Sequence, residues 1–195
     1  MKIGVVSDTH GYFDPHLPQL LGGVDEILHA GDVGSEVVLD QLRTIAPVHA
    51  VQGNVDAVAL GLPPTITRRL GSLEIHMLHV PPEPQSVLRD WAAAASLKGH
   101  MAGRFRRCLE GLRAECRMVI FGHSHEPCAL VLGGKLFFNP GSAGKKRFSL
   151  PRCCGLLEIS AQGVHATFIG LERYNEGLPE AVWLPIGGAK AWGKC

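Results

Sequence analysis

The sequence lacks three features that would each point to a particular class of protein. No run approaches the roughly 18 uncharged apolar residues of a membrane-spanning helix. The apolar stretch within residues 1–8 is too short for the core of a signal peptide. The formal net charge is only +1, so no overall charge favours nucleic acid or anionic membranes. We therefore expect a cytoplasmic protein without a membrane partner, whose other partners must be inferred from its site.

The sequence also lacks cysteine pairs with the spacing of a structural zinc site. Its six cysteines show no C-x-x-C pattern, and a chain of this size without a secretion signal rarely depends on disulfides. Cys153 and Cys154 are adjacent, so on a strand they would point to opposite faces of the sheet. We expect all six to be reduced thiols that serve packing rather than chelation.

The length and composition are typical of one globular domain. The chain has 195 residues, of which 46% are hydrophobic and 19% are charged. Three short apolar runs, at 3–6, 26–29 and 48–51, have the pattern of buried strands. Between the second and third runs, Ser35 can cap a helix that extends to Arg43. The order strand, helix, strand predicts parallel pairing.

The rest of the chain is expected to contain a hairpin, two helices and further strands. Residues 65–79 alternate in polarity around Gly71-Ser72, which predicts the hairpin. Segments 87–97 and 104–115 have helical composition and are separated by glycines. After Leu171 there is no clear periodicity, so that segment is expected to attach loosely or to cover the surface. The further strands are expected at 118–121, 128–132, 135–138, 156–159 and 164–169.

Four of the predicted strands end in loops that carry oxygen and nitrogen donors. The loops are Asp8-Thr9-His10, Gly31-Asp32, Gly53-Asn54-Val55-Asp56 and Gly122-His123-Ser124-His125. The carboxyl ends of parallel strands converge on one crevice, so these distant side chains can meet there. Carboxylate, amide and imidazole donors without cysteine suit Mn, Fe or Zn. The sequence therefore predicts a metal site at the strand ends.

These motifs carry a resemblance to a known family. Together with His79 at a predicted strand end and with Asn139-Pro140-Gly141-Ser142, they follow the motif order of calcineurin-like metallophosphoesterases. Within that superfamily the chain resembles the small bacterial and archaeal phosphodiesterase branch, which is also similar to the retromer scaffold subunit of eukaryotes. The resemblance implies an α/β fold, a β-sandwich of two mixed sheets flanked by helices. It would form a single domain over residues 1–170, followed by a C-terminal tail at 171–195.

The same resemblance implies a hydrolase that uses two divalent metal ions. Asp8, His10 and His125 would hold the first ion, Asn54, His79 and His123 the second, and Asp32 would bridge them. Asp32, Asn54 and His10 are also implied to be catalytic. Manganese is the first choice of metal, with Fe, Zn or Ni as alternatives. The expected reaction is hydrolysis of a small phosphate ester, a phosphodiester above all, by a water that both metals activate. Nucleic acid is expected only as a substrate.

Two positions depart from the family pattern. The larger phosphatases of the superfamily carry histidine directly after the motif asparagine as a leaving-group acid, whereas this chain has Val55, which cannot donate a proton. The change points to activated or diester substrates, or to another acid such as a metal-bound water. It also keeps open a catalytically weak or inactive scaffold or binding protein. His79 is followed by Val80 instead of the usual glycine. His100 therefore stays an alternative ligand, although His79 ends a predicted strand as the fold requires.

The remaining polar residues have both a structural and a functional interpretation. Asp56 is expected to support its own loop rather than to bind metal. Residues 139–142 are either a tight turn or a support for ligand loops or substrate. The basic clusters at 98–107 and 145–147 are either solvated surface or a means of capturing an anionic substrate, with Arg147 the favoured phosphate contact. Five histidines outside the motifs are expected to pack or to lie at the surface: His16, His29, His49, His76 and His165.

Overall fold

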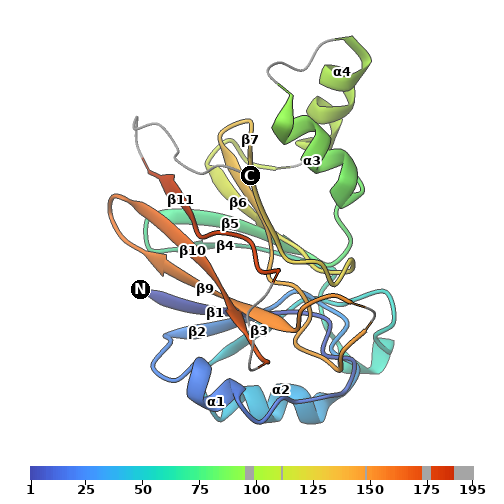
Figure 1. Ribbon diagram of the computed structural model, residues 1–195, viewed down its shortest axis with the longest axis vertical. Helices are drawn as coiled ribbons and strands as arrows, with labels where there is room; N and C mark the ends of the chain where they lie inside the picture. The colour runs from blue at the N-terminus through green and yellow to red at the C-terminus, as the bar shows by residue number, and fades with distance from the viewer. Residues whose placement is uncertain (95–98, 111, 148, 173–176, 187–195) are drawn as a thin grey trace.

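Two β-sheets pack face to face, and helices cover both outer faces of the sandwich (Figure 1). The computed structural model describes residues 1–94, 99–110, 112–147, 149–172 and 177–186. The arrangement confirms the expected α/β sandwich of two mixed sheets flanked by helices. Within the described ranges, none of the helices combines the length and the apolar character that crossing a bilayer requires.

The first sheet has six strands in the order β11-β10-β9-β1-β2-β3. Its N-terminal part is parallel, because β1 (Lys2–Val6) pairs with β2 (Glu26–His29) and β2 pairs with β3 (Val48–Ala50). The chain later returns to the other side of β1. There β9 (Cys153–Ile159) pairs with it in the antiparallel sense, and β10 (Gly163–Gly170) follows. The sheet is therefore mixed.

Two helices cover the outer face of this sheet (Figure 1). One is α1 (Leu17–Leu20), a single short turn that the sequence pattern did not predict. The other is α2 (Glu36–Arg43), which begins where expected because the Ser35 hydroxyl accepts a hydrogen bond of 3.2 Å from the Val37 backbone N–H. Their apolar faces pack on the sheet in one buried cluster, which includes Val6, Leu17, Leu21, Ile27, Val38, Leu39 and Leu42.

The second sheet has five strands in the order β4-β5-β6-β8-β7. The predicted hairpin is formed by β4 (Thr65–Leu70) and β5 (Leu73–Leu78), and a second hairpin by β7 (Cys128–Leu132) and β8 (Lys135–Asn139). Glycines with positive φ make both turns, as tight hairpin turns require. Between the hairpins β6 (Cys116–Ile120) pairs parallel to β5 and β8. This sheet is therefore also mixed.

Two further helices lie on the outer side of the second sheet (Figure 1). They are α3 (Gln85–Ala93) and α4 (Gly99–Cys108). The expected end of the first helix, at 95–97, lies outside the described residues. The expected bounds of the second, 104–115, were wrong, because α4 both begins and ends earlier. A glycine inside a helix costs only about 1 kcal/mol, so Gly103 does not interrupt a helix whose apolar face packs on the sheet.

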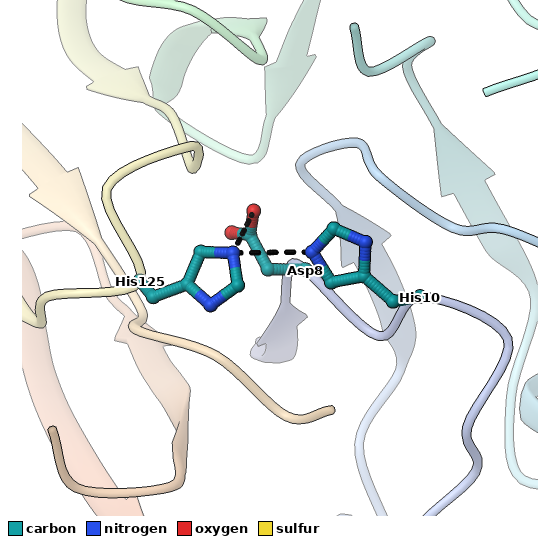
Figure 2. A group of neighbouring side chains, drawn as sticks. All are labelled: Asp8, His10 and His125. Carbon is teal, nitrogen blue, oxygen red and sulfur yellow. Dashed lines mark hydrogen bonds and ion pairs between the residues drawn. The ribbon is translucent and has the colours of Figure 1, made fainter. Parts of the chain in front are cut away.

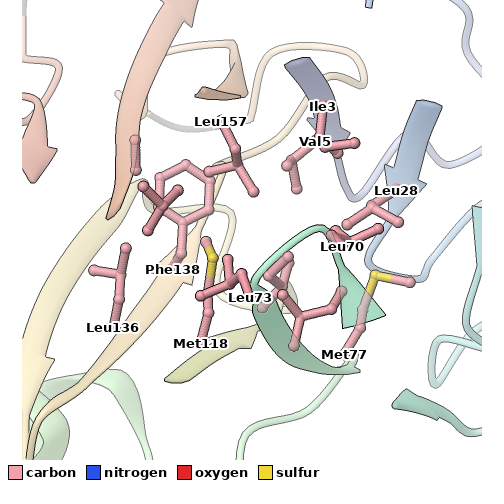
Figure 3. Close-up of a cluster of buried hydrophobic side chains, with 14 of the residues drawn as sticks. Ile3, Val5, Leu28, Leu70, Leu73, Met77, Met118, Leu136, Phe138 and Leu157 are labelled. Carbon is pink, nitrogen blue, oxygen red and sulfur yellow. The ribbon is translucent and has the colours of Figure 1, made fainter. Parts of the chain in front are cut away.

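The main core lies between the two sheets (Figure 3). Side chains from the inner faces of both sheets meet there, among them Ile3, Val5, Leu28, Met77, Met118, Leu136, Phe138 and Leu157. Because side chains alternate along a strand, the opposite faces of the same strands are left to pack on the helices. Val6 and Ile27 do so on one side and Phe137 on the other. Most strands are thus covered on two faces, which explains their nearly continuous apolar runs, whereas the edge strand β4 exposes Thr65, Thr67 and Arg69.

The segment after Leu171, for which no element was predicted, contributes a strand to the first sheet. This strand, β11 (Val182–Pro185), pairs with β10 in the antiparallel sense, with Trp183 opposite His165. Leu184 is fully buried in the core between the sheets. A strand of only four residues is too short to show a readable alternation, which is why the sequence pattern missed it.

Candidate metal centre

Five loops that each follow a strand meet beside the sandwich. They follow β1, β2 and β3 of the first sheet and β5 and β6 of the second. These loops carry all seven side chains that were expected to bind metal: Asp8, His10, Asp32, Asn54, His79, His123 and His125. The structure therefore brings together the whole set, although its members are up to 117 residues apart in sequence, from position 8 to position 125.

A first group consists of Asp8, His10 and His125 (Figure 2). The two imidazole rings point toward each other, and their Nε2 atoms are 3.1 Å apart. The Nε2 atom of His125 is also 3.3 Å from Oδ1 of Asp8. Two ring nitrogens and a carboxylate oxygen thus converge, from the loop after β1, which carries Asp8 and His10, and the loop after β6, which carries His125. Three converging protein ligands of this kind form a typical metal site.

A second group is centred on Asn54, whose Oδ1 lies 3.0 Å from Nε2 of His79 and 2.9 Å from Nδ1 of His123. The Nδ1–H of His79 donates to the Ala30 carbonyl oxygen at 2.7 Å. A neutral His79 ring therefore has its lone pair on Nε2, facing the amide oxygen of Asn54. Two acceptors at 3.0 Å repel each other unless a proton or a cation lies between them. The donor set therefore fits a cation.

Asp32 lies between the two groups. Its Oδ2 is 3.8 Å from Nε2 of His10 in the first group, and its Oδ1 is 3.3 Å from Nε2 of His79 in the second. The backbone N–H of Val55 donates to the same Oδ1 at 3.1 Å and fixes the carboxylate. One oxygen thus faces each group, as a bridging ligand requires. Asp8 is also near both groups, because its Oδ1 is 4.0 Å from Nε2 of His79.

The backbone at these residues is strained. A positive φ is uncommon for any residue except glycine and costs about 1–3 kcal/mol. In the described part of the chain, the non-glycine residues with positive φ are Asp8 (54°), His10 (48°), Asp32 (52°), His123 (72°) and His125 (59°). All five belong to the seven expected ligands. Such strain persists only where the surroundings fix the conformation, and it clusters at functional sites.

Glycines allow the ligand loops to approach one another. A Cβ atom on Gly31 would lie 2.6 Å from the Cβ of His79, and one on Gly53 would lie 2.0 Å from the backbone nitrogen of Asp32. Both distances are far below van der Waals contact, and the neighbouring atoms are backbone or the base of a ligand side chain. Any larger residue at these two positions would push ligands apart.

Burial controls the protonation of the first group. It raises the pKa of Asp8 from 3.8 to about 7, although hydrogen bonds and the nearby His79 oppose the shift. Burial, together with the neighbouring His10 and Arg147, lowers the pKa of His125 to about 4. The pKa of His10 is lowered for similar reasons. Both imidazoles are therefore neutral near pH 7, which is the form that binds metals.

Asp32 and His79 behave as an ion pair in the absence of metal. Burial favours the neutral form of both side chains, but their mutual hydrogen bond and charge outweigh it. The pKa of Asp32 is therefore lowered and that of His79 is raised. In this state the proton on Nε2 of His79 lies between the ring and the oxygens of Asn54 and Asp32. A bound cation would take the place of this proton. Metal binding to this group must release that proton.

Asp56 stabilises the loops around the second group, as expected. Its carboxylate accepts hydrogen bonds from the backbone N–H groups of Gly53 (2.8 Å), Gly34 (2.7 Å) and Val33 (3.1 Å). These bonds tie the loop that carries Asn54 to the loop that carries Asp32. With its oxygens occupied in this way, Asp56 acts on the site by positioning other residues.

The motif at 139–142 supports the ligand loops, which is one of its two expected roles. The side-chain amide of Asn139 donates to the Gly122 carbonyl at 3.0 Å and to the Ser124 hydroxyl at 2.9 Å. The Ser142 hydroxyl donates to the backbone carbonyl of Asp8 at 2.9 Å. These bonds hold the loop with the two histidines against the loop with the first aspartate.

Two further supporting residues carried little or no sequence signal. His29 is fully buried, as a packing histidine was expected to be, and its Nε2 lies 2.9 Å from the Thr9 hydroxyl. That hydroxyl donates to the Val33 carbonyl at 3.0 Å and so fixes the turn between Asp8 and His10. Gln85, the first residue of α3, accepts a hydrogen bond from Ser124 at 2.8 Å. Nothing in the local sequence distinguishes this glutamine.

The structure places His79 among the expected ligands, while the side chain of the alternative, His100, lies outside the described part of the chain. In the first basic cluster, Lys98 is likewise outside the described residues, and Arg104 forms an ion pair with Glu83. In the second cluster, Arg147 is exposed, and its charge reaches the first group, where it lowers the pKa of both histidines.

Asp8→Asn should make the metal-free protein less sensitive to pH. Between pH 4 and 7 the folded state keeps a proton on Asp8 that the unfolded chain has lost, so the free energy of unfolding falls as pH rises. The loss is up to about 4 kcal/mol, and a neutral amide avoids it. Urea denaturation of chelator-treated protein at pH 5 and pH 8 measures this difference. The control Asp40→Asn, at an exposed position, should show the same change in free energy of unfolding between pH 5 and pH 8 as wild type. If Asp8→Asn also showed the wild-type change, the raised pKa of Asp8 would be contradicted.

Solved structures share this fold across almost the whole chain. A phosphoesterase from E. coli, Yfce, superposes with a TM-score of 0.63 at 22% identity and covers 94% of this chain and 100% of its own. Vps29 from Entamoeba histolytica, in a complex with zinc, superposes with a TM-score of 0.68 at 23% identity and covers 95% of this chain and 99% of its own. At these identities the likeness shows the fold alone.

Sequence comparisons identify the family. A probable metallophosphoesterase from Methanothermobacter thermautotrophicus is 29% identical over 175 residues, which cover 87% of this chain and 92% of the relative. Another, from Methanocaldococcus jannaschii, is 31% identical over 158 residues, which cover 78% of this chain and 71% of the relative. A family model, the calcineurin-like phosphoesterase superfamily domain, matches residues 1–162. This chain therefore belongs to the calcineurin-like phosphoesterase superfamily.

Proposed function

We propose that the protein is a phosphodiesterase that depends on two divalent cations. The observation that carries the proposal is the convergence of carboxylate, amide and imidazole atoms in two adjoining groups, with Asp32 between them. We assign Asp8, His10 and His125 to the first cation, Asn54, His79 and His123 to the second, and Asp32 to both. Oxygen and imidazole donors without thiolate suit Mn, and Fe, Zn and Ni are the alternatives.

Two bound cations would lower the pKa of a shared water, orient the phosphate and offset the charge that develops during in-line displacement. The chain's own residues hold this arrangement rigid. Asp32 lies between the groups and is fixed by the Val55 N–H, while His10 and Asn54 belong to the groups on either side of it. We propose these three, Asp32, Asn54 and His10, as the residues that act directly at the reacting phosphate.

The nature of the leaving group follows from Val55. This side chain stands directly after Asn54 and is 57% exposed, so it lies at the surface of the site but has no proton to give. Without a side-chain acid at that position, an ester with a leaving group of low pKa reacts most readily. Activated esters and diesters are therefore favoured. The near-neutral chain has no strong field to attract nucleic acid, so a small phosphoester is the preferred substrate.

The first test is hydrolysis of bis-p-nitrophenyl phosphate by protein loaded with manganese. The wild-type protein should release nitrophenolate, and Asp32→Ala should reduce kcat/KM at least about 100-fold, because outer ligands of metal sites alone cost about 10–100-fold when removed. The released nitrophenolate is followed by its absorbance. If wild type loaded with Mn, Fe, Ni or Zn did no better than Asp32→Ala, the proposed activity would be wrong.

A second test concerns Arg147. Its charge acts on both histidines of the first group, and a guanidinium suits the oxygens of a phosphate. Arg147→Ala should raise KM for bis-p-nitrophenyl phosphate about tenfold, the effect of losing one charge-assisted hydrogen bond. The neighbouring Lys146 is paired with Glu172 at 2.9 Å, so Lys146→Ala serves as a matched control with an unchanged KM. An unchanged KM in Arg147→Ala would remove this residue from the binding site.

The alternative function is a scaffold or binding protein that keeps the metals but has little catalysis. Val55 favours it, because the side chain lacks the proton donor of the larger phosphatases. The two functions are separated by one pair of measurements on the same sample. Protein that binds two metals per chain, turns over no phosphoester and retains a stable partner in a quantitative pull-down would be a scaffold.

A further inference from the structure

A cavity of about 380 Å³ opens beside the second group of the candidate metal centre. Residues at its lining include Val80, Pro81, Pro84, Gln85, His123 and Ser124. His123 belongs to both the cavity and the centre, since its Nδ1 is 2.9 Å from the Asn54 amide oxygen. A molecule bound at the centre can therefore extend into this cavity without leaving the reacting position.

The cavity presents carbon surface and offers few free polar atoms. The Ser124 hydroxyl is used in a hydrogen bond of 2.8 Å to the Gln85 side-chain oxygen. The Gln85 amide nitrogen donates to the Glu126 carbonyl at 3.1 Å. Of the residues named at the lining, none carries a permanent charge, and three are valine or proline. A hydroxyl or second phosphate placed there would lose water without gaining a partner.

Exposed apolar side chains also follow the ligands of the second group in the chain. Among the described residues, the large apolar side chains that are exposed include Val55, Val58 and Val80. All three follow ligands of the second group, because Val55 and Val58 come after Asn54 and Val80 comes after His79. The first group instead lies within the field of Arg147. Exposed valines thus follow two ligands of the second group directly, Val55 after Asn54 and Val80 after His79, and Val80 also lines the cavity.

We infer that the cavity beside His123 binds an apolar, preferably aromatic, ester group of the phosphodiester substrate. The inference rests on the proposed function and defines its substrate class. Val80, which stands where the family pattern has glycine, and Pro81 and Pro84 provide the apolar surface on which such a group packs. Sugar phosphates and other polyhydroxyl esters are disfavoured, because the lining cannot replace their hydration.

The test compares two diesters with the same leaving group, bis-p-nitrophenyl phosphate and methyl p-nitrophenyl phosphate. The ratio of the two kcat/KM values, aryl over methyl, is measured in wild type, Val80→Ser and Val37→Ser. The intrinsic reactivities of the two substrates are the same in each measurement, so a change in this ratio reports on the protein alone. The aryl-to-methyl ratio should fall at least about threefold in Val80→Ser, which loses two packing methyl groups. It should stay at the wild-type value in Val37→Ser, an exposed valine of α2. An unchanged ratio in Val80→Ser would overturn the inference.

Binding tests the cavity without turnover. Phenylphosphonate and methylphosphonate are titrated separately into manganese-loaded wild-type protein, and the rise in melting temperature gives each affinity. Phenylphosphonate should bind about tenfold more tightly, as a hydrophobic pocket discriminates by about 10–200-fold for small apolar changes. Equal affinities would overturn the inference. A phenyl preference in a protein that hydrolyses no diester would keep the cavity's role and refute the proposed phosphodiesterase activity instead.

Discussion

The structure of the centre depends on one electrostatic constraint, the close approach of carboxylate, amide and imidazole atoms that need a proton or a cation between them. Carboxylate oxygens, an amide oxygen and imidazole nitrogens from five loops lie within about hydrogen-bond distance of each other, and much of the set is buried. In water these groups would stay apart and solvated. In the folded protein, protons on Asp8 and His79 compensate part of the repulsion when metal is absent. Divalent cations would compensate all of it.

The fold supplies the rigidity that this approach requires. The central strands that lead into the centre, β1, β2 and β6, pack against core clusters on both faces, so their ends are fixed on either side. Beyond the strand ends, the strained backbone at five expected ligands is held by hydrogen bonds from residues that do not bind metal. Asp56 and Asn139 provide the largest share of these bonds. The packing of the core thus outweighs the backbone strain at the expected ligands and keeps them in a fixed arrangement before any metal binds.

Much of this arrangement could be predicted from the sequence. The buried strands can be recognised in the sequence as short apolar runs, and polar loops with glycines mark their carboxyl ends. The order of the motifs in these loops then gave the expected ligands. What could not be predicted depends on contacts distant in sequence. Helix α4 passes through Gly103 because packing on the sheet outweighs the local preference, and β11 forms because β10 offers it an edge. Gln85 supports the centre from a helix whose sequence gives no sign of it.

The central claim is that these side chains surround two neighbouring cations. Electron paramagnetic resonance of protein loaded with manganese tests it directly, because two Mn(II) ions about 3.5–4 Å apart, the spacing of two-metal sites, couple magnetically. The account predicts two manganese ions per chain and the spectrum of a coupled pair, which Asp32→Ala should abolish. A spectrum of isolated Mn(II), or protein that retains no manganese after dialysis, would contradict it.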